Sequence, residues 1–208
     1  LLVKSAILHD IGALKLQQLL DAEDLDDGTK EVVKKNTQET LARYGDLDEE
    51  VPRLITQMQE LYTSESDAEI PAALKESVNA NILYVADAYD RMTAMKSFEE
   101  PTSEVKAVRE LLADEERYNK KIVNALIHGI SILYPGVCVE LTNGEKGLVV
   151  TENEDNIFEP IVLDFRNNNL YDLSDPSVKQ TVEIADVMKT MDNRIKLDKN
   201  LLEEYQAN

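Results

Sequence analysis

The sequence lacks any apolar run approaching the length of about 18 residues that a membrane-spanning helix needs, so we expect no membrane span. Its single cysteine, Cys138, excludes an internal disulfide, and no signal-peptide pattern opens the chain, so we expect a reducing, cytoplasmic location. Basic residues are also scarce, with 22 lysines and arginines against 41 aspartates and glutamates. The resulting net charge of -19 repels phosphate backbones at long range, and we therefore expect no nucleic-acid partner.

The length of the chain, 208 residues, is enough for one large domain or two small ones. Its hydrophobic fraction of 43% is ordinary for a globular protein. The chain begins with Leu1-Leu2-Val3, without a methionine and already inside an apolar segment. We therefore expect it to be a piece of a longer protein whose upstream helices are absent.

Apolar residues three and four positions apart predict helices over the first two thirds of the chain. The segments with this spacing are 29–43, 48–63, 75–95, 103–113 and 115–131. We expect 75–95 to be the longest helix, and Pro52 lies in the first turn of 48–63, where proline is tolerated. Asp114 is expected to cap the last helix by accepting a backbone N–H. Together these segments predict a helical bundle.

The pattern changes after Tyr134-Pro135-Gly136, where apolar residues begin to alternate with polar ones. Residues 137–141 alternate in this way, Asn143-Gly144 fits a type I′ turn, and 147–150 runs back, which predicts a β-hairpin. Further β-like stretches at 160–165 and 180–187 are typical of a small barrel-like module.

The predicted fold class is therefore mainly α, with a helical bundle followed by a small β-barrel-like C-terminal module. We place the helical domain over 1–132, the β-rich module over 133–188, and a polar tail that is a candidate helix over 189–208.

Two segments carry residues suited to chemistry. The first, Ile7-Leu8-His9-Asp10-Ile11-Gly12, is an apolar helix that ends on a histidine beside an aspartate. A neutral imidazole and a carboxylate at one helix end can both reach a single cation. The second, residues 82–90, places Asp87 and Asp90 on an otherwise apolar helix. Burying a carboxylate is costly unless it is paired or holds a metal, so this helix also indicates a site.

Together the two segments resemble the HD-GYP branch of the HD-domain metal-dependent phosphohydrolases. His9-Asp10-Ile11-Gly12 is similar to the HD signature, and Val85-Ala86-Asp87-Ala88-Tyr89-Asp90 with Met92-Thr93 is similar to a later helix that supplies another metal ligand. The hairpin after Tyr134-Pro135-Gly136 resembles the β module that follows the domain in some members.

This resemblance implies an HD-domain helical bundle and a bacterial phosphohydrolase of the cyclic di-GMP phosphodiesterase type. In that family a pair of metal ions, often iron or manganese, holds a hydroxide that attacks the phosphodiester. By position, His9, Asp10 and Asp87 match metal ligands, and Asp10 is also the candidate catalytic residue.

The chain also departs from the family pattern. Ala13 stands where a lysine is usual, and Asn36 where a histidine ligand is expected. Met58-Gln59-Glu60 replaces a His-His-Glu run, the Gly-Tyr-Pro loop is missing, and Lys96-Ser97-Phe98-Glu99 replaces an arginine-rich turn. We therefore expect an eroded active site with at most one divalent cation per chain, iron or manganese, and little hydrolysis of cyclic di-GMP.

Structural interpretations of the same residues remain open. His9 and Asp10 can simply end a helix, Asp87 and Asp90 can cap or form salt bridges, and His128 can be a packed helix-end histidine. Three functions follow: a phosphohydrolase with a reduced metal site, a catalytically inactive signalling or nucleotide-binding module, or an interaction module centred on the β segment and the acidic surface. The expected partners are a nucleotide or phosphate ester, a protein, or a second copy of the chain.

Overall fold

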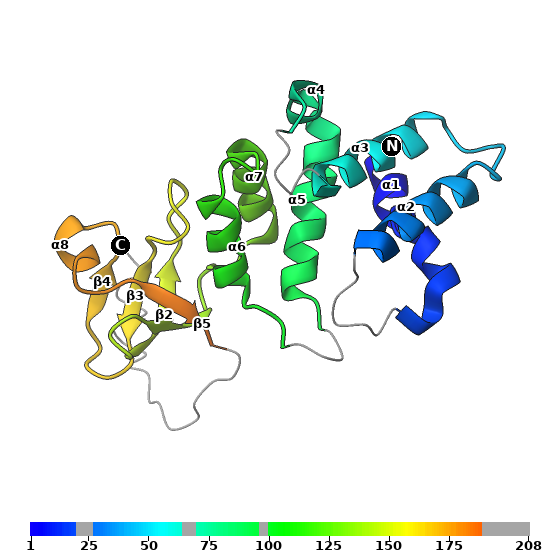
Figure 1. The fold of residues 1–208 in the computed structure, drawn as a ribbon. Coiled ribbons are helices and arrows are strands. Elements are labelled where there is room, and N and C mark those ends of the chain that lie inside the picture. Colours follow the sequence, from blue (N-terminus) through cyan, green and yellow to red (C-terminus); the bar gives the residue numbers. More distant parts are fainter. Residues whose placement is uncertain (20–26, 64–69, 96–99, 189–208) are drawn as a thin grey trace. The chain divides into compact units, whose positions relative to one another are not determined.

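The computed structural model describes residues 1–19, 27–63, 70–95 and 100–188, and Figure 1 shows the order of the elements. The chain divides into two compact units. The first comprises Leu1–Thr102 with Glu110–Asn124, and the second comprises Ser103–Arg109 with Ala125–Asn208. The domain boundary at 132 stays a prediction, and the polar tail 189–208 lies outside the described residues.

The first unit is built of helices. They are α1 (Leu2–Leu8), the 3-10 segment η1 (Ile11–Leu19), α2 (Asp27–Leu41), α3 (Glu50–Thr63), α4 (Ala72–Glu76) and α5 (Val78–Thr93). Two further helices, α6 (Glu104–Ala113) and α7 (Lys120–Ile130), contribute residues to both units. The prediction that the chain is mainly α with a small β module is confirmed.

Helix α3 forms where the spacing of apolar residues predicts it. Its buried side chains lie three or four positions apart: Val51, Leu54, Ile55, Met58 and Leu61. Pro52 is the third residue of the helix, where the missing backbone N–H has no partner to lose. Val51 and Ile55 pack with Leu41 at the end of α2, so this face joins the two helices.

The segment 75–95 is not one helix but two. The chain is extended at Ser77, with φ -73° and ψ 92°, and α5 begins after it. The buried Asn81 side chain explains the break, because its Nδ2 donates hydrogen bonds to the carbonyl oxygens of Leu74 and Ser77, both at 2.9 Å. These bonds satisfy carbonyls that a helix end leaves open. With 16 residues, α5 is still the longest of the described helices.

The connection between α6 and α7 differs from the prediction. Asp114 does accept a backbone hydrogen bond, from Arg117 at 3.1 Å, but it caps a turn rather than a helix. Helix α7 starts only at Lys120, where the Asn119 side chain accepts from the N–H of Lys121 at 3.1 Å. The predicted cap therefore lies one turn too early in the chain.

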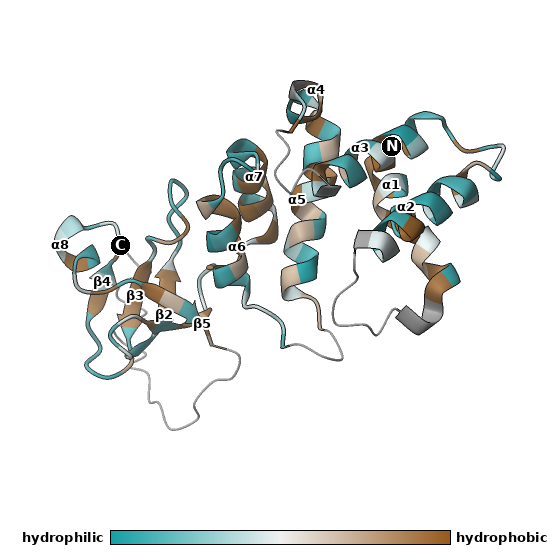
Figure 2. Ribbon diagram, viewed as in Figure 1, coloured by the Kyte–Doolittle hydropathy of each residue, from teal (hydrophilic) through white to brown (hydrophobic). Residues whose placement is uncertain are grey.

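The second unit contains an antiparallel sheet of five strands in the order β4-β3-β2-β1-β5. The strands are β1 (Cys138–Leu141), β2 (Lys146–Thr151), β3 (Ile161–Asp164), β4 (Leu170–Asp172) and β5 (Ile184–Val187). The hairpin of β1 and β2 and the stretches predicted at 160–165 and 180–187 are confirmed as strands. Figure 2 shows β2 and β3 as largely hydrophobic, in keeping with the buried side chains of Val149, Val162 and Leu163.

The predicted β-barrel is wrong, because the sheet is open. β5 pairs with β1, and β4 pairs with β3, so these two strands form opposite edges. Closure requires the edge strands to bond to each other. β4 has only three residues, and in the described part of the chain the two edges remain separate.

The hairpin turn also differs from the predicted type. A type I′ turn needs positive φ at both central residues, whereas here Gly144 has φ +80° and Asn143 is not in the left-handed region. The N–H of Gly144 donates to the carbonyl of Leu141 at 2.9 Å, and the N–H of Leu141 to the carbonyl of Glu145 at 2.8 Å. This pattern is a type I turn followed by a left-handed glycine, which makes a three-residue loop.

The first half of α6 is anchored to the sheet within the second unit. Lys106 forms an ion pair with Asp186 at 3.1 Å. Arg109 donates to the carbonyl of Ile184, and its guanidinium carbon lies 5.1 Å from the centre of the Phe158 ring. The helix thereby covers β5, one of the two strands that would otherwise be an open edge.

We predict that Gly147→Ala destabilises the β module. An added Cβ would lie 2.4 Å from Val162 Cγ1 and 2.8 Å from the carbonyl oxygen of Leu163, which belongs to the neighbouring strand and cannot move away. Overpacking of this kind costs about 1–3 kcal/mol in free energy of unfolding. Gly129→Ala is the control, because nothing lies within 4 Å of its added Cβ. Denaturant unfolding of the wild type and both variants tests this prediction. A free energy of unfolding of Gly147→Ala equal to that of the wild type would contradict it.

Candidate metal centre

His9 and Asp10 follow the last turn of α1. His9 keeps helical backbone angles, φ -60° and ψ -32°, so its side chain continues the line of the helix. Its Nδ1 lies 2.7 Å from the carbonyl oxygen of Ala6, which can only accept a hydrogen bond. Nδ1 therefore carries a hydrogen, and Nε2 is the nitrogen directed towards the site.

Asp87 reaches the same point from the middle of α5. His9 Nε2 lies 3.1 Å from Asp87 Oδ1, across 78 residues of sequence, and 3.2 Å from Asp10 Oδ2. One ligand atom from each of the three residues can be chosen so that all lie within 4.8 Å of one another. The structure thus brings together His9, Asp10 and Asp87, while their role as metal ligands stays a prediction.

The second oxygen of Asp87 is held by two groups that the sequence analysis did not place at the site. The hydroxyl of Tyr62, on α3, donates to Oδ2. Arg91 Nε lies 2.9 Å from the same oxygen, and its guanidinium carbon is 4.3 Å from the centre of the Tyr62 ring. The Asp87 side chain is only 10% exposed, so these contacts compensate a largely buried charge.

These contacts shift the titration of the groups involved. Burial disfavours the charged form of Asp87, but the hydrogen bonds from His9 and Tyr62 and the charge of Arg91 hold the pKa of its carboxyl below the usual value. Burial likewise lowers the pKa of His9, yet its hydrogen bonds to Asp10 and Asp87 outweigh this and raise the pKa to about 10. Burial, and then the charge of Asp87, raise the pKa of the Tyr62 hydroxyl.

The charges in this group balance without any added ion. At neutral pH the protonated His9 and Arg91 carry two positive charges, and the carboxylates of Asp10 and Asp87 carry two negative ones. The cluster is therefore an ion-pair network in its protonated form. A metal ion and the proton compete for the same atom, His9 Nε2.

The donor set nevertheless fits a single divalent cation. One imidazole nitrogen and two carboxylates are ligands suited to iron or manganese. The hydrogen bond from His9 Nδ1 to a backbone carbonyl is the arrangement that commonly orients a metal-binding imidazole. Asp10 is 58% exposed and His9 20%, so the cluster opens to solvent on the side of Asp10.

Gly12 fixes the chain just after these two residues. Its N–H donates to Thr37 Oγ1 at 3.1 Å, and it is packed against α2. A Cβ at this position would lie 2.4 Å from both the Thr37 nitrogen and the Val33 carbonyl oxygen. Only glycine allows this approach, which explains the glycine of the His9-Asp10-Ile11-Gly12 run on structural grounds.

The positions where the family pattern expects further ligands do not extend the cluster. Met58 is buried in the core at 2% exposure, and Asn36 is half-buried on α2. Gln59 Nε2 lies 3.4 Å from the backbone oxygen of His9, so this side chain reaches the end of α1 and supports it. Ala13 is half-buried and has no charge to offer.

Other residues considered from the sequence also lie apart from the cluster. Asp90 is exposed on α5, and Glu60 is half-buried on α3. His128 is exposed in the last turn of α7, so it is a helix-end histidine but not a packed one. The run Lys96-Ser97-Phe98-Glu99 and most of the loop after α3 lie outside the described residues.

Sequence reasoning missed Tyr62 and Arg91, although one signal was available. Arg91 follows Asp87 by four positions on the same helix, a spacing at which side chains meet. Tyr62 lies near the end of the predicted helix 48–63, among apolar residues, where an aromatic side chain is typical of a core position. Its ring does pack edge-on against Tyr84, with centres 4.6 Å apart, but its hydroxyl faces Asp87.

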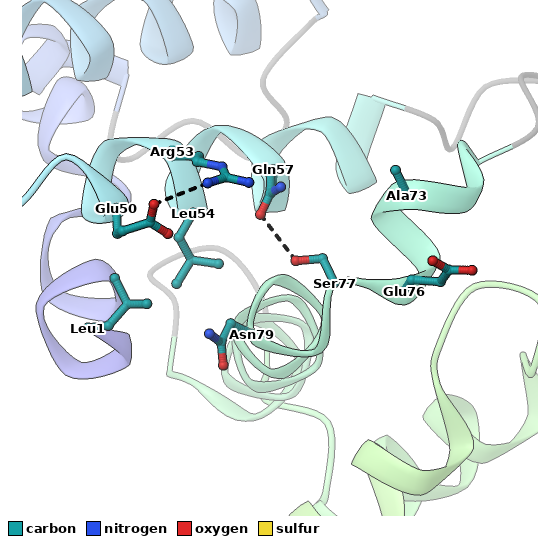
Figure 3. Close-up of a pocket in the computed structure, with 9 residues that line it drawn as sticks. All are labelled: Leu1, Glu50, Arg53, Leu54, Gln57, Ala73, Glu76, Ser77 and Asn79. Atoms are coloured by element: carbon teal, nitrogen blue, oxygen red, sulfur yellow. Dashed lines mark hydrogen bonds and ion pairs between the residues drawn. The ribbon is translucent and has the colours of Figure 1, made fainter.

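A separate cleft of about 400 Å³ lies at the starts of α3 and α5 (Figure 3). The residues that line it are Leu1, Glu50, Arg53, Leu54, Gln57, Ala73, Glu76, Ser77 and Asn79. Four of its polar side chains form two pairs, Arg53 with Glu50 and Ser77 with Gln57, both at 3.1 Å. Ser77 precedes Asp87 by ten residues, or roughly 15 Å along a helix, so the cleft is distinct from the cluster.

Comparison of the chain with protein-family models, with curated proteins and with solved structures found no match. Over the residues that the structure describes, no helix has both the length and the apolar character needed to cross a membrane. The family resemblance, the cytoplasmic location and the expected partners stay predictions.

We predict that His9 stabilises the metal-free protein most strongly at low pH. Its pKa of about 10 in the folded chain exceeds the unfolded value of 6.5, so its stabilisation is fully present below pH 6.5 and is lost as the pH rises through about 10. The difference in free energy of unfolding between the wild type and His9→Gln, measured with a chelator present, should shrink over that range. A difference that grows with pH would show that His9 is neutral in the folded protein.

Proposed function

We propose that the chain is an HD-type phosphohydrolase-like module, related to the cyclic di-GMP phosphodiesterases, that holds at most one divalent cation at His9, Asp10 and Asp87. The observation that supports this is the convergence of one imidazole and two carboxylates from α1 and α5 at a single point. These are the same three residues that match the family's ligands by position. Iron or manganese suits this mixture of nitrogen and oxygen donors.

Each residue of the site would have a distinct chemical role. A cation bound at His9, Asp10 and Asp87 would supply Lewis acidity and would lower the pKa of a nearby water molecule. His9 contributes Nε2 as a ligand once its proton has left. Asp87 contributes Oδ1, in the orientation set by Tyr62 and Arg91. Asp10, the most exposed of the three, can both bind the cation and accept a proton from the attacking water.

The activity towards cyclic di-GMP is proposed to be weak. Only one nitrogen ligand is present in the cluster, which is too few to hold a stable pair of transition metals. Met58 is enclosed in the core, and Ala13 leaves no cation at the position of the family's lysine. In-line attack on a phosphodiester depends on charge compensation of this kind, and losing one such group costs about a hundredfold or more in rate.

A second candidate is a catalytically inactive signalling or nucleotide-binding module. The balance of charges among His9, Asp10, Asp87 and Arg91 favours it, because the cluster is already an ion-pair network without a metal. The two candidates differ in whether a divalent cation displaces the proton from His9 at neutral pH.

We predict that the purified protein binds at most one Mn²⁺ or Fe²⁺ per chain, and that Asp87→Ala abolishes this binding. The loss follows because Asp87 supplies one of three ligands and fixes His9 by a hydrogen bond. Asp90→Ala is the matched control, since Asp90 is exposed on the same helix and lies outside the cluster. Elemental analysis and calorimetric titration give the stoichiometry.

Two results of that measurement would change the proposal. A stoichiometry near two per chain would contradict the single-cation site. Absence of binding in the wild type would instead favour the inactive signalling module, and a test of nucleotide binding to the metal-free protein would then be decisive for that function.

We also predict that the protein with Mn²⁺ or Fe²⁺ hydrolyses cyclic di-GMP far more slowly than about one turnover per second, a typical enzymatic rate. The assay should include phosphomonoesters and nucleotides, because a single cation beside the exposed Asp10 leaves room for a smaller substrate. A cyclic di-GMP turnover of about one per second or faster that Asp87→Ala removes would overturn the idea of an eroded site.

A further inference from the structure

The two oxygens of Asp87 face different partners. Oδ1 faces His9 Nε2 at 3.1 Å, on the side where a cation would bind. Oδ2 faces Arg91 Nε at 2.9 Å and also accepts the Tyr62 hydroxyl. The two oxygens of Asp87 therefore face two different cationic groups, the imidazole of His9 and the guanidinium of Arg91.

We propose that Arg91 is a built-in cation of the site, which competes with a bound metal ion for the charge of Asp87. This inference rests on the proposed function, because it concerns how tightly the single cation is held. It assigns to Arg91 a role that limits metal affinity, in addition to neutralising a buried carboxylate.

The position of Arg91 is fixed by its surroundings. It lies one helical turn after Asp87 on α5, and its guanidinium carbon is 4.3 Å from the centre of the Tyr62 ring. The Tyr62 ring packs against Tyr84, which is fully buried and stacks on Tyr118 with ring centres 5.3 Å apart. A cation over an aromatic face is attracted by the ring, so the guanidinium is held by a rigid support.

The charge of Arg91 is permanent. A guanidinium is not deprotonated in proteins, so Arg91 cannot yield to a metal ion by losing a proton, as His9 can. A divalent ion on the Oδ1 side of Asp87 therefore meets a carboxylate whose charge is already shared, with a second positive charge on its far oxygen. Like charges on the two sides of one carboxylate repel each other, and this repulsion is partly screened because Asp87 is buried while the Arg91 side chain is half exposed.

Replacing Arg91 by a neutral residue should have two opposite effects. The metal-free protein becomes less stable, because Asp87 is only 10% exposed and loses its main compensating charge. The metal-bound protein loses a repulsion and gains a more basic ligand. Metal addition should therefore raise the melting temperature of the variant more than that of the wild type.

The test is a calorimetric titration of the full chain with Mn²⁺, together with thermal unfolding with and without the ion. Arg91→Ala and Arg91→Gln both remove the charge, but glutamine keeps a hydrogen-bond donor for Asp87. Comparison of these two variants therefore separates the effect of the lost charge from the effect of a lost hydrogen bond that orients Asp87. Arg91→Lys keeps the charge. Arg53→Ala is the control, because Arg53 pairs with the exposed Glu50 on α3, away from the cluster.

We expect Arg91→Ala and Arg91→Gln to bind Mn²⁺ about tenfold more tightly than the wild type, as screened repulsion between neighbouring charges implies. Arg91→Lys and Arg53→Ala should bind it like the wild type. If both neutral variants bind no more tightly than the wild type, or if only Arg91→Ala does, charge competition is excluded and Arg91 merely positions Asp87.

The titration also separates this inference from the proposed function. Binding by the wild type with no gain in the neutral variants keeps the single-cation site and overturns the role of Arg91. If only the neutral variants bind Mn²⁺, the role of Arg91 is supported and the proposed cation site of the wild type is overturned, because Arg91 then keeps the wild type metal-free. Binding by none of the proteins overturns both.

Discussion

The buried carboxylate of Asp87 is the constraint on which the rest of the site depends. A carboxylate removed from water is stable only when positive charges or hydrogen-bond donors surround it. Asp87 obtains them from three helices: His9 at the end of α1, Tyr62 on α3 and Arg91 on its own helix, α5. These contacts tie the end of α1 to α3 and α5, and Gly12 then lets the following segment lie directly on α2. The contacts of one carboxylate therefore both hold the end of α1 against two helices and set the geometry of the candidate centre.

The same contacts explain why one geometry supports two proposals for function. The arrangement that would present His9 Nε2 to a metal ion also makes it an excellent site for a proton, because two carboxylates lie beside it. With the proton in place, the cluster is a balanced set of ion pairs. With a cation in place, Asp10 and Asp87 would become ligands, and the fixed charge of Arg91 would remain as a neighbour. Whether His9 Nε2 holds a proton or a metal ion therefore separates the ion-pair network from the proposed metal centre.

The β module follows a simpler physical rule, the burial of apolar side chains on its central strands. Side chains such as Val139, Val149 and Val162 are fully buried, and α6 supplies Lys106 and Arg109 to the edge strand β5. The sequence pattern was enough to locate four of the five strands, but not the short β4. It could not show whether the sheet closes, because closure depends on which strands become edges, and β5 pairs with β1 rather than with β4.

The sequence by itself determined the elements whose apolar periodicity fits only one type of secondary structure. The apolar spacing of α3, the β1–β2 hairpin and the change from helix to strand after residue 134 all followed from it, because each buries one face of a regular backbone. The resemblance to a family also predicted that His9, Asp10 and Asp87 lie together as ligands of one metal site. Only the tertiary structure decided the division of 75–95 at Ser77, the open sheet, and the contacts of Asp87 with Tyr62 and Arg91. The break depends on hydrogen bonds from the Asn81 side chain to nearby backbone carbonyls, which apolar spacing does not reveal. The sheet edges and the contacts of Asp87 depend on which elements meet in the fold, and the spacing that places Tyr62 on an apolar helix face is the same whether its hydroxyl meets water or a buried carboxylate.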